Sequence, residues 1–224
     1  MIEQPFALFR PYAKQIDVRH FTKEDQLSDD MIVMATLGTA AFVTLDQVHG
    51  AKTIIVKTPS HRSQKADGAA TTAKGLTLVM RTADCQPLLV YAPDKKMIGM
   101  IHAGWRGLVA GVIPSFFEAI RKEWNVEPKG TIVCIGPSLC TDCAEFTDPE
   151  KELPDVDTSF FHGSHVDLQG IADQQLDQLG IPHTQRERSP DCVKCKKDEY
   201  WSVRGGDAEA IDGNCRNMLT ICLK

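Results

Sequence analysis

The chain of 224 residues is 42% hydrophobic, which is enough to bury a sizeable core in one domain. Thirty acidic and twenty-five basic residues give a net charge of −5. Beyond a short cluster at Lys194, Lys196 and Lys197 there is no basic run, so nucleic acid is excluded as an expected partner.

No apolar run approaches the roughly 20 residues of a membrane span, and the first residues lack a signal-peptide pattern. We therefore expect a cytoplasmic protein without a membrane partner. Its eight cysteines are then thiols, metal ligands or catalytic groups rather than disulfides.

Short apolar runs predict most of the strands. The stretch FVTLDQVHG reads as apolar sequence that ends at Gly50. The turn-like PDKK between two later runs predicts a β-hairpin. The predicted strands after Gly50 are residues 76–81, 86–92, 97–102, 131–136 and the C-terminal run MLTICL.

From Gly107 the apolar period changes to four, which predicts a helix up to Trp124 that is kinked or interrupted at Pro114. Residues 166–182 form a second amphipathic pattern, ended by a glycine and a proline. The irregular stretch 140–165 is expected to be a loop over the surface. Because strands and helices alternate without repeats or a linker, the predicted class is α/β in a single domain, residues 1–224.

The junction between the predicted strand and helix, HAGWRG at residues 102–107, is the strongest local signal. Its two glycines allow close approach of the backbone to a ligand, and the following helix start offers free N–H groups. Arg106 adds a positive charge there. The junction is therefore expected to accept an anion.

Three side chains that can bind a metal lie at the ends of three predicted strands: His49, Cys85 and His102. A thiolate with two imidazoles is a ligand set for zinc, and three protein ligands leave a position open, as in catalytic sites. The same set also describes a blue-copper centre. The simpler alternative is that Cys85 is a small buried apolar residue and that the histidines are satisfied core or loop residues.

Two further cysteine pairs, Cys140 with Cys143 and Cys192 with Cys195, could form a four-thiolate zinc site. The 48 residues between the pairs exceed the usual spacing of about 15 to 20, so unpaired structural thiols are the preferred interpretation. His162 and His165 lie in a polar loop and are expected to be solvated.

Several motifs occur in an order that resembles the laccase-domain, or polyphenol-oxidase-like, family of purine nucleoside phosphorylases. The resemblance runs from about residue 40 to the end, and TADC followed by HAGWRG at this separation is specific to that family. The matching motifs are Gln47-Val-His49-Gly50, Ala66-Asp67-Gly68, Thr82-Ala83-Asp84-Cys85, His102 to Gly107, Ile135-Gly136-Pro137 followed by Cys143-Ala-Glu145, Val166-Asp-Leu168, Cys192-x-x-Cys195 and Ser202-x-Arg204.

The resemblance implies a layered α/β/β/α fold of mixed sheets with a metal, zinc or copper, held by His49, Cys85 and His102. It also implies purine nucleosides and phosphate as partners. Adenosine, inosine or methylthioadenosine would be cleaved to the free base and a ribose 1-phosphate, and adenosine would be deaminated at the same site. The fold is also similar to the catalytic domain of cytotoxic necrotising factor, a Cys-His deamidase.

The chain departs from the family pattern at both ends. Residues 1–40 are divergent and shortened, because the usual Gly-Gly-x-Ser turn is missing after Arg19. Near the C-terminus the family commonly shows two adjacent arginines, whereas here Arg204 is the single match and Arg216 a looser one. Weaker phosphate binding is the expected consequence.

The first functional hypothesis is a metal-dependent purine nucleoside phosphorylase with adenosine deaminase activity. Deamination needs a carboxylate that carries a proton, for which Asp84 and Glu145 are the candidates. Phosphorolysis needs a phosphate site, which is predicted from Arg106, Gly107, Arg204 and Arg216.

A metal-free hydrolase with Cys85 as nucleophile and His102 as base is the alternative, and a non-catalytic metal-binding protein is the third hypothesis. His49 distinguishes the first two, because it is needed only as a metal ligand. Multicopper laccase chemistry is set aside, since seven histidines without a His-x-His pair cannot build the additional copper cluster.

Overall fold

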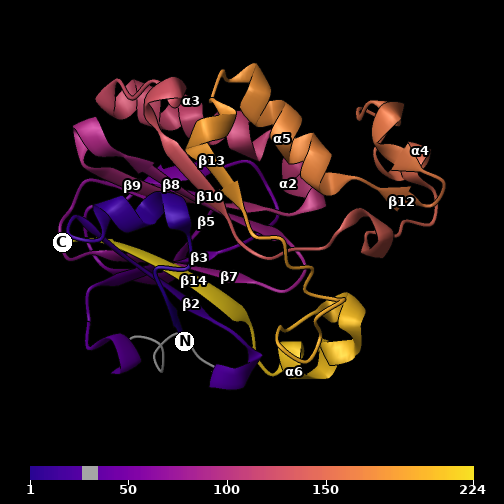
Figure 1. The fold of residues 1–224 in the computed structure, drawn as a ribbon, viewed down its shortest axis with the longest axis horizontal. Helices are drawn as coiled ribbons and strands as arrows, with labels where there is room; N and C mark the ends of the chain where they lie inside the picture. The colour runs from indigo at the N-terminus through magenta and orange to yellow at the C-terminus, as the bar shows by residue number, and fades with distance from the viewer. Residues whose placement is uncertain (27–34) are drawn as a thin grey trace.

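The structure, a computed structural model, describes residues 1–26 and 35–224. Within these ranges the strands form two six-stranded sheets and one short hairpin (Figure 1). Sheet A has the order β1 (Ile2–Glu3), β2 (Ile16–Phe21), β14 (Asn217–Leu223), β7 (Thr77–Thr82), β3 (Phe42–Asp46) and β5 (Ser60–Lys65). Sheet B has the order β13 (Arg186–Arg188), β10 (Ile132–Ile135), β8 (Gln86–Ala92), β9 (Met97–Ala103), β6 (Gly68–Thr71) and β4 (Thr53–Ile55).

Both sheets are mixed. In sheet A, β7 pairs antiparallel with β14 and parallel with β3, and in sheet B, β10 pairs antiparallel with β8 and parallel with β13. Strands β8 and β9 are buried along their whole length, which explains their continuous apolar sequences. They form an antiparallel hairpin through the short 3-10 helix Pro93–Lys95, so the hairpin predicted from PDKK is confirmed.

The two sheets pack face to face, and one apolar core fills the space between them. A second core lies between the other face of sheet B and the helices α2 (Trp105–Val109), α3 (Val112–Trp124) and α5 (Leu168–Gln178), which cover that face (Figure 1). A small apolar cluster lies on the remaining face of sheet A: Phe21, Phe42, Val79 and Met218. The predicted single-domain α/β class with two mixed sheets is confirmed.

The helix predicted after Gly107 is divided in two, as expected, but not at Pro114. The break lies between Val109 and Val112, where Gly111 has a φ of +74° that suits glycine. Pro114 instead lies in the first turn of α3, where a missing backbone N–H costs little.

The prediction of a surface loop for residues 140–165 is wrong in part. The stretch contains α4 (Pro149–Glu152), the hairpin β11 (Phe161–His162) and β12 (His165–Val166), and two 3-10 turns. Its apolar side chains at Cys143, Phe146 and Leu153 are buried, because they pack against the core under α5 and against a small cluster around Leu139. Most of its polar side chains, and Pro154, face solvent in the way a loop predicts.

The divergent N-terminal part predicted for residues 1–40 includes residues 27–34, which lie outside the described residues. Of the rest, β1 and β2 extend sheet A beside β14, with the 3-10 helix Ala7–Tyr12 between them. Among the described residues, no helix combines the length and the apolar character needed to cross a membrane. The remaining short helices are Lys23–Asp25, Pro128–Gly130, Thr141–Cys143, Thr158–Phe160, His183–Gln185, Val203–Asp207 and α6 (Ala208–Asp212).

Candidate metal centre and active site

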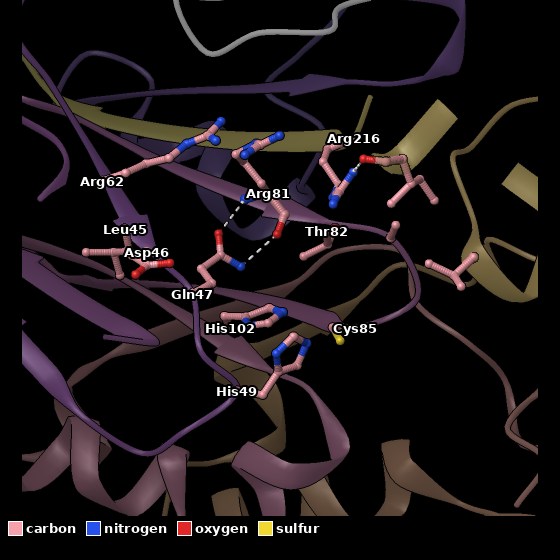
Figure 2. Close-up of a pocket in the computed structure, with 13 residues that line it drawn as sticks. Leu45, Asp46, Gln47, His49, Arg62, Arg81, Thr82, Cys85, His102 and Arg216 are labelled. Atoms are coloured by element: carbon pink, nitrogen blue, oxygen red, sulfur yellow. Dashed lines mark hydrogen bonds between the residues drawn. The ribbon is translucent and has the colours of Figure 1, made fainter. Parts of the chain in front are cut away.

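The three predicted metal ligands meet at one end of the two sheets. His49 follows β3, Cys85 lies between β7 and β8, and His102 belongs to β9 (Figure 2). Their ligand atoms lie within 4.8 Å of one another. His102 is buried, Cys85 is half-buried and His49 is exposed, so the group opens to solvent on the side of His49. We call these residues the His-Cys-His site.

Hydrogen bonds hold the strand ends that carry this site. The side chain of Gln47 donates to the carbonyl of Arg81 at 2.8 Å and accepts from its N–H at 3.1 Å, which joins the end of β3 to β7 (Figure 2). His49 and Asp84 have φ values of +59° and +91°, a region that non-glycine residues seldom occupy. Such strain is typical of functional sites and persists only where the surrounding contacts enforce it.

Asp67 supports the His-Cys-His site from the buried side. It is a functional residue that was not among the site residues predicted from the sequence. Its side chain is fully buried and accepts hydrogen bonds from His102 Nδ1 at 2.8 Å and from the backbone N–H groups of His49 and Gly50 at 2.9 and 2.7 Å. One carboxylate therefore orients the imidazole of His102 and the loop that carries His49. A carboxylate behind a histidine ligand is the usual support of a metal site. The available signal was a single acid beside small residues in the sequence ADGAA at residues 66–70.

The charges of Cys85 and His102 support each other. Burial raises the pKa of the Cys85 thiol, but the positive charge and hydrogen bond of His102 outweigh this effect and lower it below the usual thiol range. Burial in turn lowers the pKa of His102, while Cys85 and Asp67 outweigh it and raise this pKa. Cys85 is therefore held as a thiolate, which is the form that binds metals.

The two glycines of the HAGWRG motif are needed for a different reason from the predicted approach of a ligand: neighbouring atoms leave no room for a side chain. A Cβ atom at Gly104 would lie 2.8 Å from Cδ2 of His49 and 2.9 Å from Sγ of Cys85, so only glycine lets the backbone pass the site. A Cβ atom at Gly107 would lie 3.1 Å from the carbonyl oxygen of Gly50. The helix that follows has only five residues, so the anion site predicted at its start has little support. A role of Gly107 in anion binding stays a prediction.

Two cavities adjoin the His-Cys-His site, and both are lined by His49 and Cys85. The Arg216 cavity is also lined by Arg62 and Arg81 (Figure 2). The Arg204 cavity is also lined by Arg106, Asp84, Trp105, Leu139 and Leu168. The predicted arginines are thus divided between two cavities, and Arg62 and Arg81 are additions that the sequence patterns did not indicate.

Asp84 positions the backbone at Arg204. Its Oδ1 accepts a hydrogen bond from Ser202 Oγ at 2.5 Å, and its Oδ2 accepts one from the N–H of Arg204 at 3.0 Å. Burial raises the pKa of Asp84, although the hydrogen bond from Ser202 opposes this shift. A raised pKa suits a group that carries protons near neutral pH.

The other predicted catalytic acid, Glu145, is placed differently. Its side chain is exposed and lines neither of the two cavities, whereas its backbone carbonyl accepts a hydrogen bond from the guanidinium of Arg204. The guanidinium of Arg204 also lies 5.3 Å from the centre of the Phe146 ring. Glu145 thus contributes its backbone to the position of Arg204.

The arginines of the two cavities differ in their contacts. The guanidinium of Arg216 donates to the carbonyls of Ile211 and Cys215, and that of Arg81 donates to Asn214. By contrast, Arg106 packs over the ring of Trp105 at 4.0 Å, a contact that uses none of its N–H groups.

The two histidines that were expected to be solvated and the two cysteine pairs also have clear outcomes. His162 is exposed and His165 is half-buried, and neither belongs to a group of metal-capable side chains within the described residues. Four further cysteines are free thiols, as expected, but they gather at one place, because their sulfur atoms lie within 4.8 Å of one another. We call this group the four-cysteine cluster: Cys140, Cys143, Cys192 and Cys195.

Comparison with known proteins places these features in one family. A family model described as multi-copper polyphenol oxidoreductase laccase matches residues 24–223. The chain is 30% identical over 169 residues to the purine nucleoside phosphorylase SCO2081 of Streptomyces coelicolor, which covers 72% of this chain and 69% of that protein. It is also 30% identical to the human purine nucleoside phosphorylase LACC1, over 62% of this chain and 35% of that protein.

Solved structures show the same fold. The crystal structure of the hypothetical protein YfiH from Bacillus licheniformis superposes with a TM-score of 0.73 at 26% identity, covering 86% of this chain and 79% of that chain. YlmD from Geobacillus stearothermophilus gives the same TM-score at 24% identity over 86% and 78% of the two chains.

Proposed function

Because the chain belongs to the family described as multi-copper polyphenol oxidoreductase laccase, several of whose curated members are named purine nucleoside phosphorylases, we propose that it is a metal-dependent purine nucleoside phosphorylase. The observation that carries this proposal is the His-Cys-His site between two cavities that contain arginines. The substrates would be adenosine, inosine or methylthioadenosine with phosphate, and adenosine would also be deaminated.

The donor set fits a metal ion. Cys85 is held as a thiolate, and Asp67 binds Nδ1 of His102, so Nε2 faces the other two side chains. His49 completes three ligands and leaves the exposed side open, as a catalytic zinc site requires; the same set would accept copper. When bound, such an ion supplies a Lewis acid that polarises water or a substrate oxygen.

The Arg204 cavity suits the nucleoside. Trp105, Leu139 and Leu168 give it an apolar lining against which a purine ring can pack. Asp84 lies beside them and would take up or return the proton that deamination moves from the attacking water to the leaving ammonia. Because both oxygens of Asp84 accept hydrogen bonds, it also keeps Arg204 facing this cavity.

Phosphorolysis forms a bond from a phosphate oxygen to C1′ of the ribose while the bond from C1′ to the purine nitrogen breaks. The electron pair of that bond stays on the purine, which takes up a proton as it leaves. Arg204 and Arg106 are the best-placed groups to hold the phosphate, since both line the cavity and, within residues 1–26 and 35–224, the guanidinium of Arg106 packs on a ring without donating a hydrogen bond. Arg216 donates to two backbone carbonyls, whereas Arg204 donates to one, which gives Arg216 a smaller expected share.

Replacement of Arg204 by alanine is expected to separate the two activities. Loss of a hydrogen bond to a charged partner costs about 1.5 to 3 kcal/mol, so phosphorolysis efficiency should fall roughly 10- to 150-fold, mainly through the KM for phosphate. Deamination uses no phosphate and should stay within about twofold of the unchanged protein. Steady-state kinetics with varied phosphate measure the first effect, and conversion of adenosine to inosine measures the second.

Arg216→Ala is the matched variant, because it removes the same charge from the other cavity. A larger rise of the phosphate KM in Arg216→Ala than in Arg204→Ala would place the phosphate in the Arg216 cavity and contradict this assignment. Equal loss of both activities in Arg204→Ala would show that the residue supports the site as a whole.

The function itself is tested by incubating the purified protein with adenosine or inosine, with and without phosphate, and separating the products. Release of the free base that requires phosphate supports phosphorolysis, and inosine formed from adenosine without phosphate supports deamination. Absence of both reactions in protein with a full metal complement would contradict the proposal.

One observation favours a second candidate function. The thiolate of Cys85 beside a positively charged His102 is also the arrangement of a Cys-His hydrolase. The variant His49→Ala distinguishes the two, since His49 is a metal ligand without a place in that pair. Full activity of His49→Ala after its metal has been lost would favour the hydrolase.

A further inference from the structure

The four-cysteine cluster lies outside the His-Cys-His site and has no part in the proposed reaction. Sγ of Cys195 lies 3.6 Å from Sγ of Cys143 and 4.0 Å from Sγ of Cys140, and all four sulfurs are within 4.8 Å of one another. Tetrahedral zinc binds sulfur at about 2.3 Å, which puts its ligand sulfurs about 3.8 Å apart. The cluster therefore has the spacing of ligands around a single ion.

The strands of sheet B create this proximity. The parallel pairing of β10 with β13 brings the chain segments that follow them side by side, and a bridge between Ser138 and Cys192 continues the pairing. The N–H of Val193 donates to the carbonyl of Ser138 at 3.2 Å. Each segment then delivers two cysteines, three residues apart, to the same place. The long separation in sequence is thus compatible with one compact site.

A backbone N–H group supports one of the four sulfurs, as hydrogen bonds commonly support metal ligands. The N–H of Cys140 donates to Sγ of Cys192 at 3.4 Å. Four thiolates around a divalent ion carry a net charge of −2, and two lysines of the same segment are close in sequence: Lys194 lies between Cys192 and Cys195, and Lys197 follows Cys195 by two residues, whereas Lys196 pairs with Asp191 and Glu199.

We propose that the four-cysteine cluster binds one zinc ion in a structural site. Four protein ligands close the coordination sphere, which is the mark of a structural rather than a catalytic zinc. Binding replaces the four thiol protons, which are released to solvent, and no oxidant or reductant takes part. Iron-sulfur clusters also use four cysteines, but they need room for several iron and sulfide atoms inside the ligand sulfurs, and this spacing leaves room for one ion.

The zinc would stabilise one side of the Arg204 cavity. The apolar cluster around it is small, with Leu139, Val193 and Tyr200 as its main members beside the cysteines. The N–H of Leu139 donates to the carbonyl of Asp84, and two residues after Tyr200 the chain reaches Ser202, which binds the Asp84 side chain. An ion that joins the two segments therefore fixes both the Leu139 side of the cavity and the approach to Arg204.

Metal analysis of the full chain, purified under reducing conditions without added chelator, tests the proposal. We expect one equivalent of zinc in addition to the metal of the His-Cys-His site. After reconstitution with cobalt, the protein should show the absorption of tetrahedral cobalt bound by four thiolates. These two measurements need no variant and do not depend on activity.

Cys195→Ser is the informative variant, because Cys195 is the exposed member of the cluster and its replacement disturbs packing least. It should lose one equivalent of zinc and the four-thiolate cobalt spectrum, and it should melt at a lower temperature. The metal of the His-Cys-His site should remain. Cys222→Ser, at a cysteine of β14 outside both groups, is the matched control and should keep both metals.

Three results would overturn the proposal. The first is full zinc content in Cys195→Ser together with an unchanged cobalt spectrum. The second is iron as the tightly bound metal at the cluster. The third is a pair of disulfides within the cluster, seen as a mass four hydrogens lower in freshly purified protein. Failure of the nucleoside assays would leave the proposal unaffected, since the cluster does not depend on the reaction.

Discussion

Cys85→Ser is expected to lose the metal of the His-Cys-His site and with it both nucleoside activities. A serine hydroxyl is not ionised near neutral pH, so it offers neither the charge nor the soft sulfur that zinc or copper prefers in this set. The two histidines that remain are too few to hold a catalytic ion tightly. Metal analysis should show one equivalent less than in the unchanged protein, and activity should fall to the background of the assay.

The fold should survive this change. Cys85 lies in a loop between β7 and β8 at the rim of a cavity, so a smaller polar side chain there leaves no void in either apolar core. The zinc of the four-cysteine cluster should remain, and the double variant with Cys195→Ser should contain no tightly bound metal. Full metal content in Cys85→Ser at unchanged activity would contradict the assignment of Cys85 as a ligand.

The apolar strands of the fold were predictable because a strand that is buried on both faces has an uninterrupted run of apolar residues in the sequence. The boundaries of β8 agree with the predicted 86–92, and the hairpin to β9 follows from its turn residues. Polar strands at sheet edges carry no such signal. The strand β5, with the sequence SHRSQK, lies at the edge of sheet A and was not predicted, and Arg62 of the Arg216 cavity lies on it.

The two groups of metal-capable residues also differ in whether apolar or polar strands bring them together. The His-Cys-His site could be predicted because each ligand lies at or within a few residues of the end of an apolar strand, and these strand ends meet in the structure. The four-cysteine cluster could not, because β13 has the polar sequence RER, and its parallel pairing with β10 is what joins the two cysteine pairs. A spacing rule taken from zinc ribbons does not describe ligands delivered by two paired strands.

Asp67 shows how a supporting residue escapes sequence reasoning. A single acid beside small residues indicates a buried carboxylate, but the identity of its partners depends on how β6 and β9 pair. In the structure it binds the loop before β4 and the imidazole on β9 at once. Its role in the site is therefore a property of the tertiary fold.

Asp67→Asn is expected to weaken metal binding about 10- to 100-fold, the usual cost of losing the carboxylate behind a histidine ligand. An amide has one acceptor oxygen where the carboxylate has two. If that oxygen keeps His102 Nδ1 and the N–H of His49, the amide nitrogen must face the N–H of Gly50, which then loses its acceptor. The free energy of unfolding of the metal-free protein should therefore fall by about 1 to 3 kcal/mol.

Competition with a chelating dye measures the metal affinity, and urea unfolding of metal-free protein measures the stability. Asp173→Asn removes the same charge at a surface ion pair with Arg188 and should change stability by less than about 0.5 kcal/mol and leave metal affinity unchanged. If Asp67→Asn lost stability but kept full metal affinity, the carboxylate would act only on the loop of His49. The metal affinity therefore reports whether Asp67 orients His102, and the stability reports whether Asp67 holds the loop of His49.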